Sequence, residues 1–148
     1  MFQVTRILCP IDFSPSAEAA LVLAVSMAER FDASIDVVHV WSPHVLTIFD
    51  ATVVPSGEAV VAQITALQAR LDETIAAVSR SGRTLRGHLV QGAPLEVILA
   101  LAVRERSDLI VMGTHGRSGL GRLLLGSIAE HVVRTAPIPV LTTVVRKD

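Results

Sequence analysis

Residues 109–127 read LIVMGTHGRSGLGRLLLGS, and this stretch is the most informative part of the chain for the fold. It opens with four consecutive apolar residues, Leu109–Met112, which is typical of a strand buried on both faces. A loop with glycines at 113, 116, 119, 121 and 126 follows, and Ser127 then predicts the start of a helix that runs to about Ala136. A buried strand, a glycine-rich loop and a helix in this order indicate an α/β protein.

The same alternation of short apolar runs and helical periodicity continues through the rest of the chain. Ser14 is a predicted N-cap before Pro15, Gly82 is predicted to end the second helix, and Pro94 is predicted to open the third. The other strands are predicted at Ile7–Ile11, Ile35–Val40, Leu85–Val90 and Val140–Val145, and the second helix is predicted over Val60–Val78. This β-α-β-α-β-α-β-α-β order predicts one domain, residues 1–148, with a parallel sheet covered by helices on both faces.

The composition argues against several classes of function. The 148 residues carry a formal net charge of −1 and are only 3% aromatic, so neither a basic surface nor a base-stacking platform for nucleic acid is expected. The apolar runs are shorter than the ~20 residues of a membrane span, and Met1–Arg6 does not resemble a secretory signal, so we expect a cytoplasmic protein. The single cysteine, Cys9, excludes a C-x-x-C site and is expected to be a buried apolar residue. No metal site is expected either, because the histidines that lie outside the glycine loop share no metal-ligand spacing; they are His39, His44, His88 and His131.

Two segments follow strands at the edge where parallel sheets bind ligands. They are Pro10–Asp12, after the first strand, and the loop Gly113–Ser127. Glycines let main-chain amides approach an anion closely, and a helix N-terminus adds further unpaired amides and the positive end of its dipole. No acidic residue occurs between Leu109 and Ala129. The glycine loop is therefore a candidate phosphate-binding site.

Three common phosphate-binding motifs are excluded. A Walker A loop needs a lysine directly after its last glycine, where this chain has Ser127. Protein-kinase chemistry also needs a lysine, on a strand, and the only lysine here is Lys147. The dinucleotide motif G-x-G-x-x-G is not matched, because Gly121 is followed by Arg, Leu and Leu.

The spacing that is present is G-x-x-G, nine residues and then G-S, formed by Gly113, Gly116, Gly126 and Ser127. Together with the P-I-P-V-L of the last strand, the turn after the first strand, the length and the order of elements, it closely resembles the universal stress protein family in its ATP-binding branch. The resemblance covers the whole chain. It implies an open, Rossmann-like sheet of five parallel strands in the order 3-2-1-4-5, similar to that of the adenine nucleotide alpha hydrolases.

The resemblance also implies a ligand and its contacts. ATP would lie between the ends of the first and fourth strands, with Mg²⁺ held mainly by phosphate oxygens and water. The implied cofactor-binding residues are Pro10, Ile11 and Asp12 on the adenosine side, Val40 at the adenine, Met112, Gly113, His115, Gly116 and Arg117 around the ribose and phosphates, and Gly126, Ser127 and Ile128 at the phosphates. Family members commonly pair through the last strand, so the resemblance implies a homodimer through Val140–Val145, and a regulatory partner that it does not identify.

Several of these residues also have structural interpretations. Ser127 opens the pattern S-x-x-E, a capping box, so its hydroxyl could cap the helix, bind phosphate, or do the first in the empty protein and the second in the complex. Asp12 could be a cap near Ser14. Arg117 could belong, like Arg122, to a solvated face of the loop, and the imidazole of His115 could contact phosphate or remain exposed.

The segment Ser42–Gly57 is longer than an ordinary connection and unusually apolar for a loop. A short extra helix folded back on the body is the expectation, with a lid or a partner surface as the alternatives. Trp41, just before it, could shield an adenine pocket or a subunit contact.

Three functions fit this sequence. A nucleotide-dependent stress sensor or regulator is favoured over a slow ATPase or self-phosphorylating enzyme with Ser127 or Thr114 as acceptor, because no lysine is available for the γ-phosphate and only Asp12 or His115 could act as a base. No catalytic residue is therefore assigned. The glycine pattern argues against the third function, a nucleotide-free interaction protein. Gly126→Ala is expected to weaken ATP binding with little loss of fold, because its Cβ would occupy the space of a phosphate oxygen.

Overall fold

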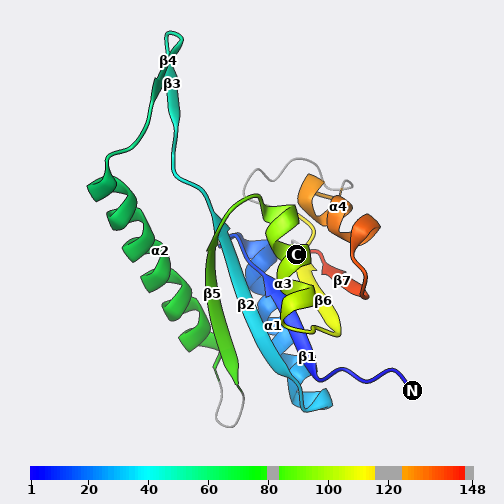
Figure 1. Ribbon diagram of the computed structural model, residues 1–148. Helices are drawn as coiled ribbons and strands as arrows, with labels where there is room; N and C mark the ends of the chain where they lie inside the picture. Colours follow the sequence, from blue (N-terminus) through cyan, green and yellow to red (C-terminus); the bar gives the residue numbers. More distant parts are fainter. Residues whose placement is uncertain (80–83, 116–124, 146–148) are drawn as a thin grey trace.

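The computed structural model describes residues 1–79, 84–115 and 125–145 of the chain (Figure 1). Helices and strands alternate along these residues, apart from one pair of consecutive short strands, β3 and β4. The elements are β1 (Arg6–Pro10), α1 (Pro15–Phe31), β2 (Ser34–Trp41), β3 (Leu46–Ile48), β4 (Ala51–Val53), α2 (Gly57–Val78), β5 (Leu85–Gln91), α3 (Pro94–Arg104), β6 (Leu109–Gly113), α4 (Ser127–Thr135) and β7 (Val140–Thr143).

Five of the strands form one parallel sheet in the order β5-β2-β1-β6-β7. Leaving out the two short strands, this is the predicted order 3-2-1-4-5, which is confirmed. The chain builds outward from β1 through β2 to β5, then crosses back through α3 to β6 on the other side of β1. The winding therefore reverses between β1 and β6, and an open α/β sheet binds its ligands at such a point.

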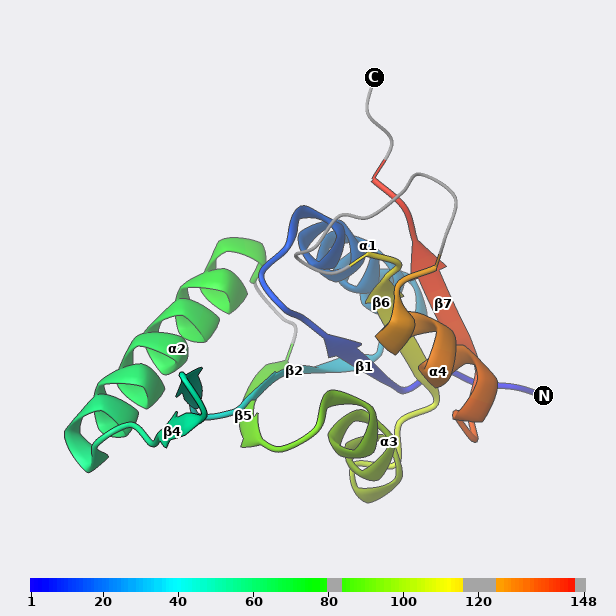
Figure 2. The ribbon, with the colours of Figure 1, turned by 90° about the horizontal axis from the view of Figure 1, so that it is seen from above.

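Helices cover both faces of the sheet, as predicted. Figure 2 shows α1 and α2 on one face and α3 and α4 on the other. Each pair of helices closes a separate apolar core, one centred on residues such as Ile7 and Leu21 and the other on Leu8 and Ile110. The approach of α1 to β6 is very close, because a Cβ built on Gly113 would lie 2.5 Å from Ser16 Oγ.

The helix ends follow the sequence signals in part. Ser14 is the N-cap of α1, where its hydroxyl accepts a hydrogen bond from the Ala17 amide at 3.2 Å, as predicted. Helix α2 ends at Val78, followed by Ser79 in an extended conformation, so the helix stops before the predicted terminator Gly82, which lies outside the described residues.

The capping-box interpretation of Ser127 is wrong. The N-cap of α4 is Gly126, whose carbonyl accepts the first helical hydrogen bond, from the Glu130 amide at 2.9 Å. Ser127 is therefore the first residue inside the helix. A side chain at that position cannot take the place of the N-cap oxygen.

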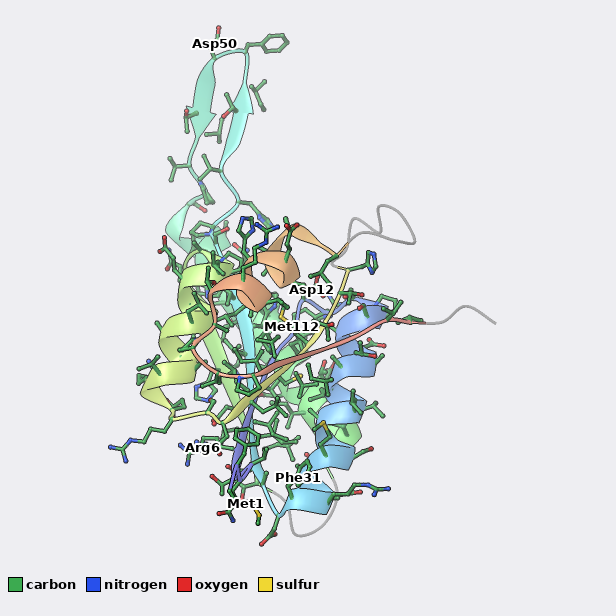
Figure 3. The ribbon with its side chains drawn as sticks, turned by 90° about the vertical axis from the view of Figure 1, so that its right-hand side faces the viewer. Met1, Arg6, Asp12, Phe31, Asp50 and Met112 are labelled. Atoms are coloured by element: carbon green, nitrogen blue, oxygen red, sulfur yellow. The ribbon has the colours of Figure 1, made fainter. Side chains whose placement is uncertain are left out.

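The expectation of an extra helix within Ser42–Gly57 is also wrong, because the segment forms the β3–β4 hairpin. β-Branched residues dominate its strands, which favours extended structure. Phe49 and Asp50 both have positive φ, 48° and 63°, and such a two-residue turn matches the twist of the strands it connects. Figure 3 shows Asp50 at the tip of the hairpin, well clear of the body.

The amino ends of the strands carry a network of charges. Asp36, on β2, is fully buried, with its Oδ1 3.0 Å from Arg86 Nε and 2.8 Å from His88 Nε2 on the neighbouring strand β5. Arg6, on β1, and Glu105, at the end of α3, extend the network. A buried carboxylate needs such partners, since an unpaired charge in the core is strongly destabilising.

No described helix combines the length and the apolar character needed to cross a membrane.

Candidate functional site

A cavity of about 300 Å³ opens where β1, β2 and β6 end and α4 begins. Its volume is at the lower end of the range typical of small-molecule sites, and most of its walls are apolar with a few polar groups, as such sites require. In Figure 3, Asp12 and Met112 mark this end of the sheet, and Arg6 marks the opposite end. The lining residues are Pro10, Ile11, Asp12, Ala17, Val38, Val40, Pro94, Ile98, Met112, Gly113, Thr114, His115, Gly126, Ser127, Ile128 and Ala129.

Every residue that the resemblance assigned to the nucleotide, and that the structure describes, lines this one cavity. The assigned residues Gly116 and Arg117 lie outside the described residues, as does Arg122. The convergence joins the ends of three strands and the start of a helix, and Pro10 and Ser127 among them are more than a hundred residues apart in the sequence.

The assignment missed part of the lining. Val38 precedes Val40 by two residues on β2, and this spacing places both on the same face of the strand, so the sequence did hold a signal for it. Pro94 and Ile98 come from α3, and Ala17 from α1. Their position at the cavity depends on how the helices pack over the strand ends, which no local pattern reveals.

The wall formed by Ile11 is fixed from behind by His39. The Ile11 amide donates to the Val38 carbonyl at 2.8 Å, and His39 Nδ1 lies 2.9 Å from the Ile11 carbonyl oxygen. Since a carbonyl only accepts, Nδ1 carries the proton. The His39 ring packs against Phe13, at 4.4 Å between centroids, and the guanidinium of Arg70 lies 4.3 Å from the Phe13 ring centroid. The buried His39 is therefore structural, as predicted.

Asp12 follows Ile11 and also lines the cavity. Its Oδ1 accepts a hydrogen bond from the Ser14 amide at 3.0 Å, so it orders the turn into α1. The N-cap of α1 is Ser14 and not Asp12. Asp12 therefore supports the cap while its carboxyl group also faces the cavity, and the two interpretations of this residue are compatible.

Thr114 holds the opposite wall together. Its amide and its hydroxyl both donate to the Thr143 carbonyl, at 3.1 Å, which ties the end of β6 to β7. His115 Nδ1 lies 2.8 Å from the Thr114 hydroxyl oxygen. Because that hydroxyl donates its proton to Thr143, His115 Nδ1 donates to Thr114.

Gly126 is required by this wall as well as by any ligand. Its amide donates to the Thr114 carbonyl at 2.6 Å, and a Cβ at position 126 would lie 2.7 Å from the same carbonyl oxygen. The expectation that Gly126→Ala leaves the fold almost intact is therefore contradicted. The close approach of two backbone segments by itself requires glycine here.

The electrostatic character of the cavity suits a ligand with an anionic end. Among the described lining residues, Asp12 is the only acidic one, and it stands on the β1 side. Ser127 and Ile128 lie in the first turn of α4, where main-chain amides lack helical partners and the helix dipole is positive. The arrangement can therefore receive an apolar or aromatic group between the strand ends and an anion at α4.

The remaining sequence expectations concern residues away from this chemistry. No group of His, Cys, Asp or Glu side chains within the described residues could hold a metal ion. Cys9 is fully buried, and burial raises the pKa of its thiol to about 12, so it behaves as the apolar residue that was predicted. Trp41 is buried at the end of β2 but does not line the cavity, so it does not shield an adenine pocket there.

Comparison with known proteins gives a consistent result. The model of the universal stress protein family matches residues 3–144. A universal stress protein of Thermus aquaticus is 38% identical in an alignment of 143 positions that covers 91% of this chain and 95% of that protein. Its identity and coverage are high enough to establish common family membership.

Solved structures share the fold over nearly the whole chain. The hypothetical protein MJ0577 of Methanocaldococcus jannaschii superposes with a TM-score of 0.81 at 25% identity, covering 99% of both chains. A universal stress protein in complex with cAMP has a TM-score of 0.71 at 23% identity, covering 95% of this chain and 97% of its own. Another, from Archaeoglobus fulgidus in complex with dAMP, has a TM-score of 0.65 at 21% identity, covering 96% and 98%. The match to the family model and the identity to the Thermus relative show that this chain belongs to the universal stress protein family.

Proposed function

We propose that this chain binds ATP in the cavity at the strand ends and acts in the cytoplasm as a nucleotide-dependent sensor or regulator of a stress response. The observation that carries the proposal is the convergence of the assigned residues on one cavity at the switch point between β1 and β6. The two fold relatives in complex with cAMP and dAMP support an adenine nucleotide as the ligand class.

The lining suggests an orientation for the nucleotide. The adenosine end fits the apolar wall of Pro10, Ile11 and Val40, where the carboxylate of Asp12 can accept hydrogen bonds from ribose hydroxyls. The phosphates then point toward Gly126 and the first turn of α4. Met112, Gly113, His115 and Ile128, with Gly116 and Arg117 of the glycine loop, complete the proposed contacts. Mg²⁺ would bind through phosphate oxygens and water.

Binding fits the geometry better than catalysis. Asp12 and His115 are the only acid–base side chains among the described lining residues, and each is engaged, with the Ser14 amide and the Thr114 hydroxyl respectively. The buried Thr114 hydroxyl donates to a carbonyl, so it is poorly placed to accept a phosphoryl group. The exposed hydroxyl of Ser127 is the better acceptor if the protein modifies itself.

Pairing through the last strand remains part of the proposal. Strand β7 is at the edge of the sheet, and Val144 and Val145, which follow it, are exposed. An unpaired edge with apolar neighbours is suited to a second copy of the chain.

The decisive experiment separates binding from folding at Ser127. A glutamate in the first turn of a helix interacts favourably with the helix dipole, so Ser127→Glu is expected to keep or raise stability. The same carboxylate would repel the phosphates of ATP and weaken binding about tenfold to hundredfold, which titration calorimetry measures. Ser127→Gln is the matched control, because it has nearly the same size without the charge.

Nucleotide analysis completes the test. Mass spectrometry of gently purified protein is expected to find ATP or ADP bound to the wild type and much less on Ser127→Glu. Equal ATP affinity in the glutamate and glutamine variants would refute the proposed phosphate position. Absence of any nucleotide, together with no calorimetric binding, would favour an interaction protein of the same fold. Turnover of ATP above background would favour the enzyme.

A further inference from the structure

The β3–β4 hairpin is exposed, and none of its residues lines the proposed nucleotide cavity. Figure 1 shows it extending from the end of β2 beyond the rest of the molecule. Large apolar side chains are exposed along it, namely Val45, Ile48, Phe49, Val53 and Val54. An exposed apolar patch of this kind on a small domain usually marks an interaction site.

One face of the hairpin concentrates this apolar character. In the register of the pair, Ile48 is opposite Ala51 and Thr47 is opposite Thr52. Because side chains alternate between the faces of a strand, Ile48, Ala51 and Val53 share one face, and the two threonines share the other. Within the paired strands the hairpin is therefore amphipathic, and nothing among the described residues covers its apolar face. Val45 and Val54, which flank the strands, fall by the same alternation on the threonine side. An isolated two-stranded hairpin is at best marginally stable in water, so such a face needs a partner.

The turn gives an independent indication. Phe49 has φ 48° in the left-handed region, which is costly for a large side chain, and it is 99% exposed. Asn or Gly is the ordinary choice at this position of the turn. A phenylalanine that has a strained backbone and is almost fully exposed suggests a pocket on another molecule, where aromatic side chains often anchor interfaces.

Helix α2 begins four residues after the hairpin and also carries exposed apolar side chains. Its apolar stripe packs against the core at Leu67, Leu71, Ile75 and Val78. Ile64, one turn earlier on the same stripe, is exposed, and so is its neighbour Val61. The apolar stripe of α2 is therefore longer than the part of it that packs against the core.

We propose that the hairpin is a self-association arm, whose apolar face of Ile48, Ala51 and Val53 packs against the same face of a second copy of this chain, with Phe49 as the anchor. A symmetric interface brings one patch against itself, so the patch must tolerate its own charges. Asp50, at the tip, is the only charged residue between Val45 and Val54. The lack of basic residues in this segment disfavours an anionic membrane as the occupant.

The size of the surface agrees with a second copy. The exposed apolar side chains of that face, of Phe49 and of the start of α2 present on the order of 500 Å² per chain, if a fully exposed large side chain contributes about 150–200 Å². Two copies would then bury about 1,000 Å², the least that a specific interface is expected to bury. This surface is distinct from the β7 edge, and its proposed role does not depend on nucleotide binding.

The test compares two variants, each of which adds two lysines to one face of the hairpin. Ile48→Lys with Val53→Lys opposes like charges across the proposed interface, whereas Thr47→Lys with Thr52→Lys adds them to the other face. All four positions are exposed, so the fold of the body should survive, which circular dichroism verifies. In sedimentation equilibrium, the apolar-face variant is expected to show half the mass of the wild type, and the control variant the wild-type mass.

Three other outcomes would overturn the proposal. Equal masses for the three proteins would show that the arm does not associate copies of this chain, leaving a different partner. Equal masses together with a changed ATP affinity in the apolar-face variant would identify the hairpin as a lid. Halved masses in both variants would show that added charge alone dissociates the protein. Normal ATP binding by a dissociated apolar-face variant would confirm that arm and cavity act separately, whereas loss of binding in the wild type concerns only the proposed function.

Discussion

The two ends of the sheet are built from the same strands but differ in chemistry. At the amino ends, Arg6 and Arg86 pair with the buried Asp36 across three neighbouring strands, and His88 makes a hydrogen-bond contact with the same carboxylate. At the carboxyl ends, β1, β2 and β6 surround a cavity lined mainly by apolar side chains and main-chain groups. Within β2 alone, the change from one chemistry to the other takes place over the few residues between Asp36 and Val40.

This difference separates the residues that stabilise the fold from those that can bind a ligand. The charges of the amino end are compensated within the protein, so they contribute to folding and leave little for a ligand. At the carboxyl ends of the strands, Asp12 and the first turn of α4 line a cavity. A ligand there can hydrogen-bond to groups that have no partner within the helix. Substitutions at the amino end should therefore change stability alone, and substitutions at the carboxyl end should change affinity.

The largest effect is expected for Asp36→Ala. Removing the buried carboxylate leaves Arg86 and His88 without their shared partner, and we expect a loss of about 3 kcal/mol in the free energy of unfolding, measured by urea denaturation. The value is at the low end for a buried pair because Arg86 is 44% exposed and can be hydrated. Glu130→Ala, which removes a surface pair with Arg134, is the control, with an expected loss of about 0.5 kcal/mol or less. Lower ATP affinity of folded Asp36→Ala would contradict the separation of the two ends.

Gly126→Ala should affect both properties. The added Cβ would lie 2.7 Å from the Thr114 carbonyl oxygen, so the backbone must shift, at a cost of about 1–3 kcal/mol in unfolding free energy together with weaker ATP binding. Gly57→Ala is the matched control, because a Cβ there meets nothing within 4 Å, and it should stabilise the start of α2 by up to about 1 kcal/mol. If Gly126→Ala lost affinity with unchanged stability, the space for the ligand would be the sole reason for this glycine.

Asp12→Asn tests whether the charge of Asp12, at the carboxyl ends of the strands, contributes to binding and not to stability. The amide oxygen of asparagine can still accept from the Ser14 amide, so stability should change little, whereas the loss of charge should weaken the proposed ribose contact. We expect about tenfold weaker ATP binding, which is about 1.4 kcal/mol, by calorimetry. Asp72→Asn on α2, whose carboxylate accepts from Gln68, is the control and should bind ATP normally. A normal affinity of Asp12→Asn would move the ribose away from this residue.

The smallest effect is expected at Asp108, beside the amino end of the sheet. Burial alone would raise the pKa of this carboxyl, but hydrogen bonds from Thr5 and Arg6 outweigh it and lower the pKa below the ordinary value. A carboxyl group with a lowered folded-state pKa stabilises the protein above its unfolded pKa of about 4, and this contribution is lost as the pH falls through the folded pKa.

Asp108→Asn should therefore cost about 1 kcal/mol near neutral pH, because the hydrogen bonds lose their charge assistance. The difference from the wild type should shrink as the pH falls below about 4, which urea denaturation at several pH values measures. A difference that stays constant down to pH 3 would mean that the carboxylate charge is not what stabilises this contact.

The local signals of the sequence were reliable where one element forms by itself. The N-cap at Ser14 and the strand Leu109–Met112 were predicted because a cap and a buried strand depend on a few adjacent residues. The hairpin was not predicted, because the length and the apolar composition of Ser42–Gly57 favoured a short extra helix. The β-branched residues and the turn of this segment form a hairpin instead. Asp36 was not recognised as a buried charge, since its partners on β5 lie about fifty residues away in the sequence.

The sequence by itself determined the alternation of strands and helices, the glycine spacing and the set of residues that the family resemblance assigned to a nucleotide. These properties are local, or follow from a resemblance that extends along the whole chain. The tertiary structure alone shows that those assigned residues which it describes border one cavity, that α3 contributes to this cavity and that Gly126 passes close to Thr114. Such contacts arise from packing between elements that are distant in the chain, and no short-range periodicity encodes them.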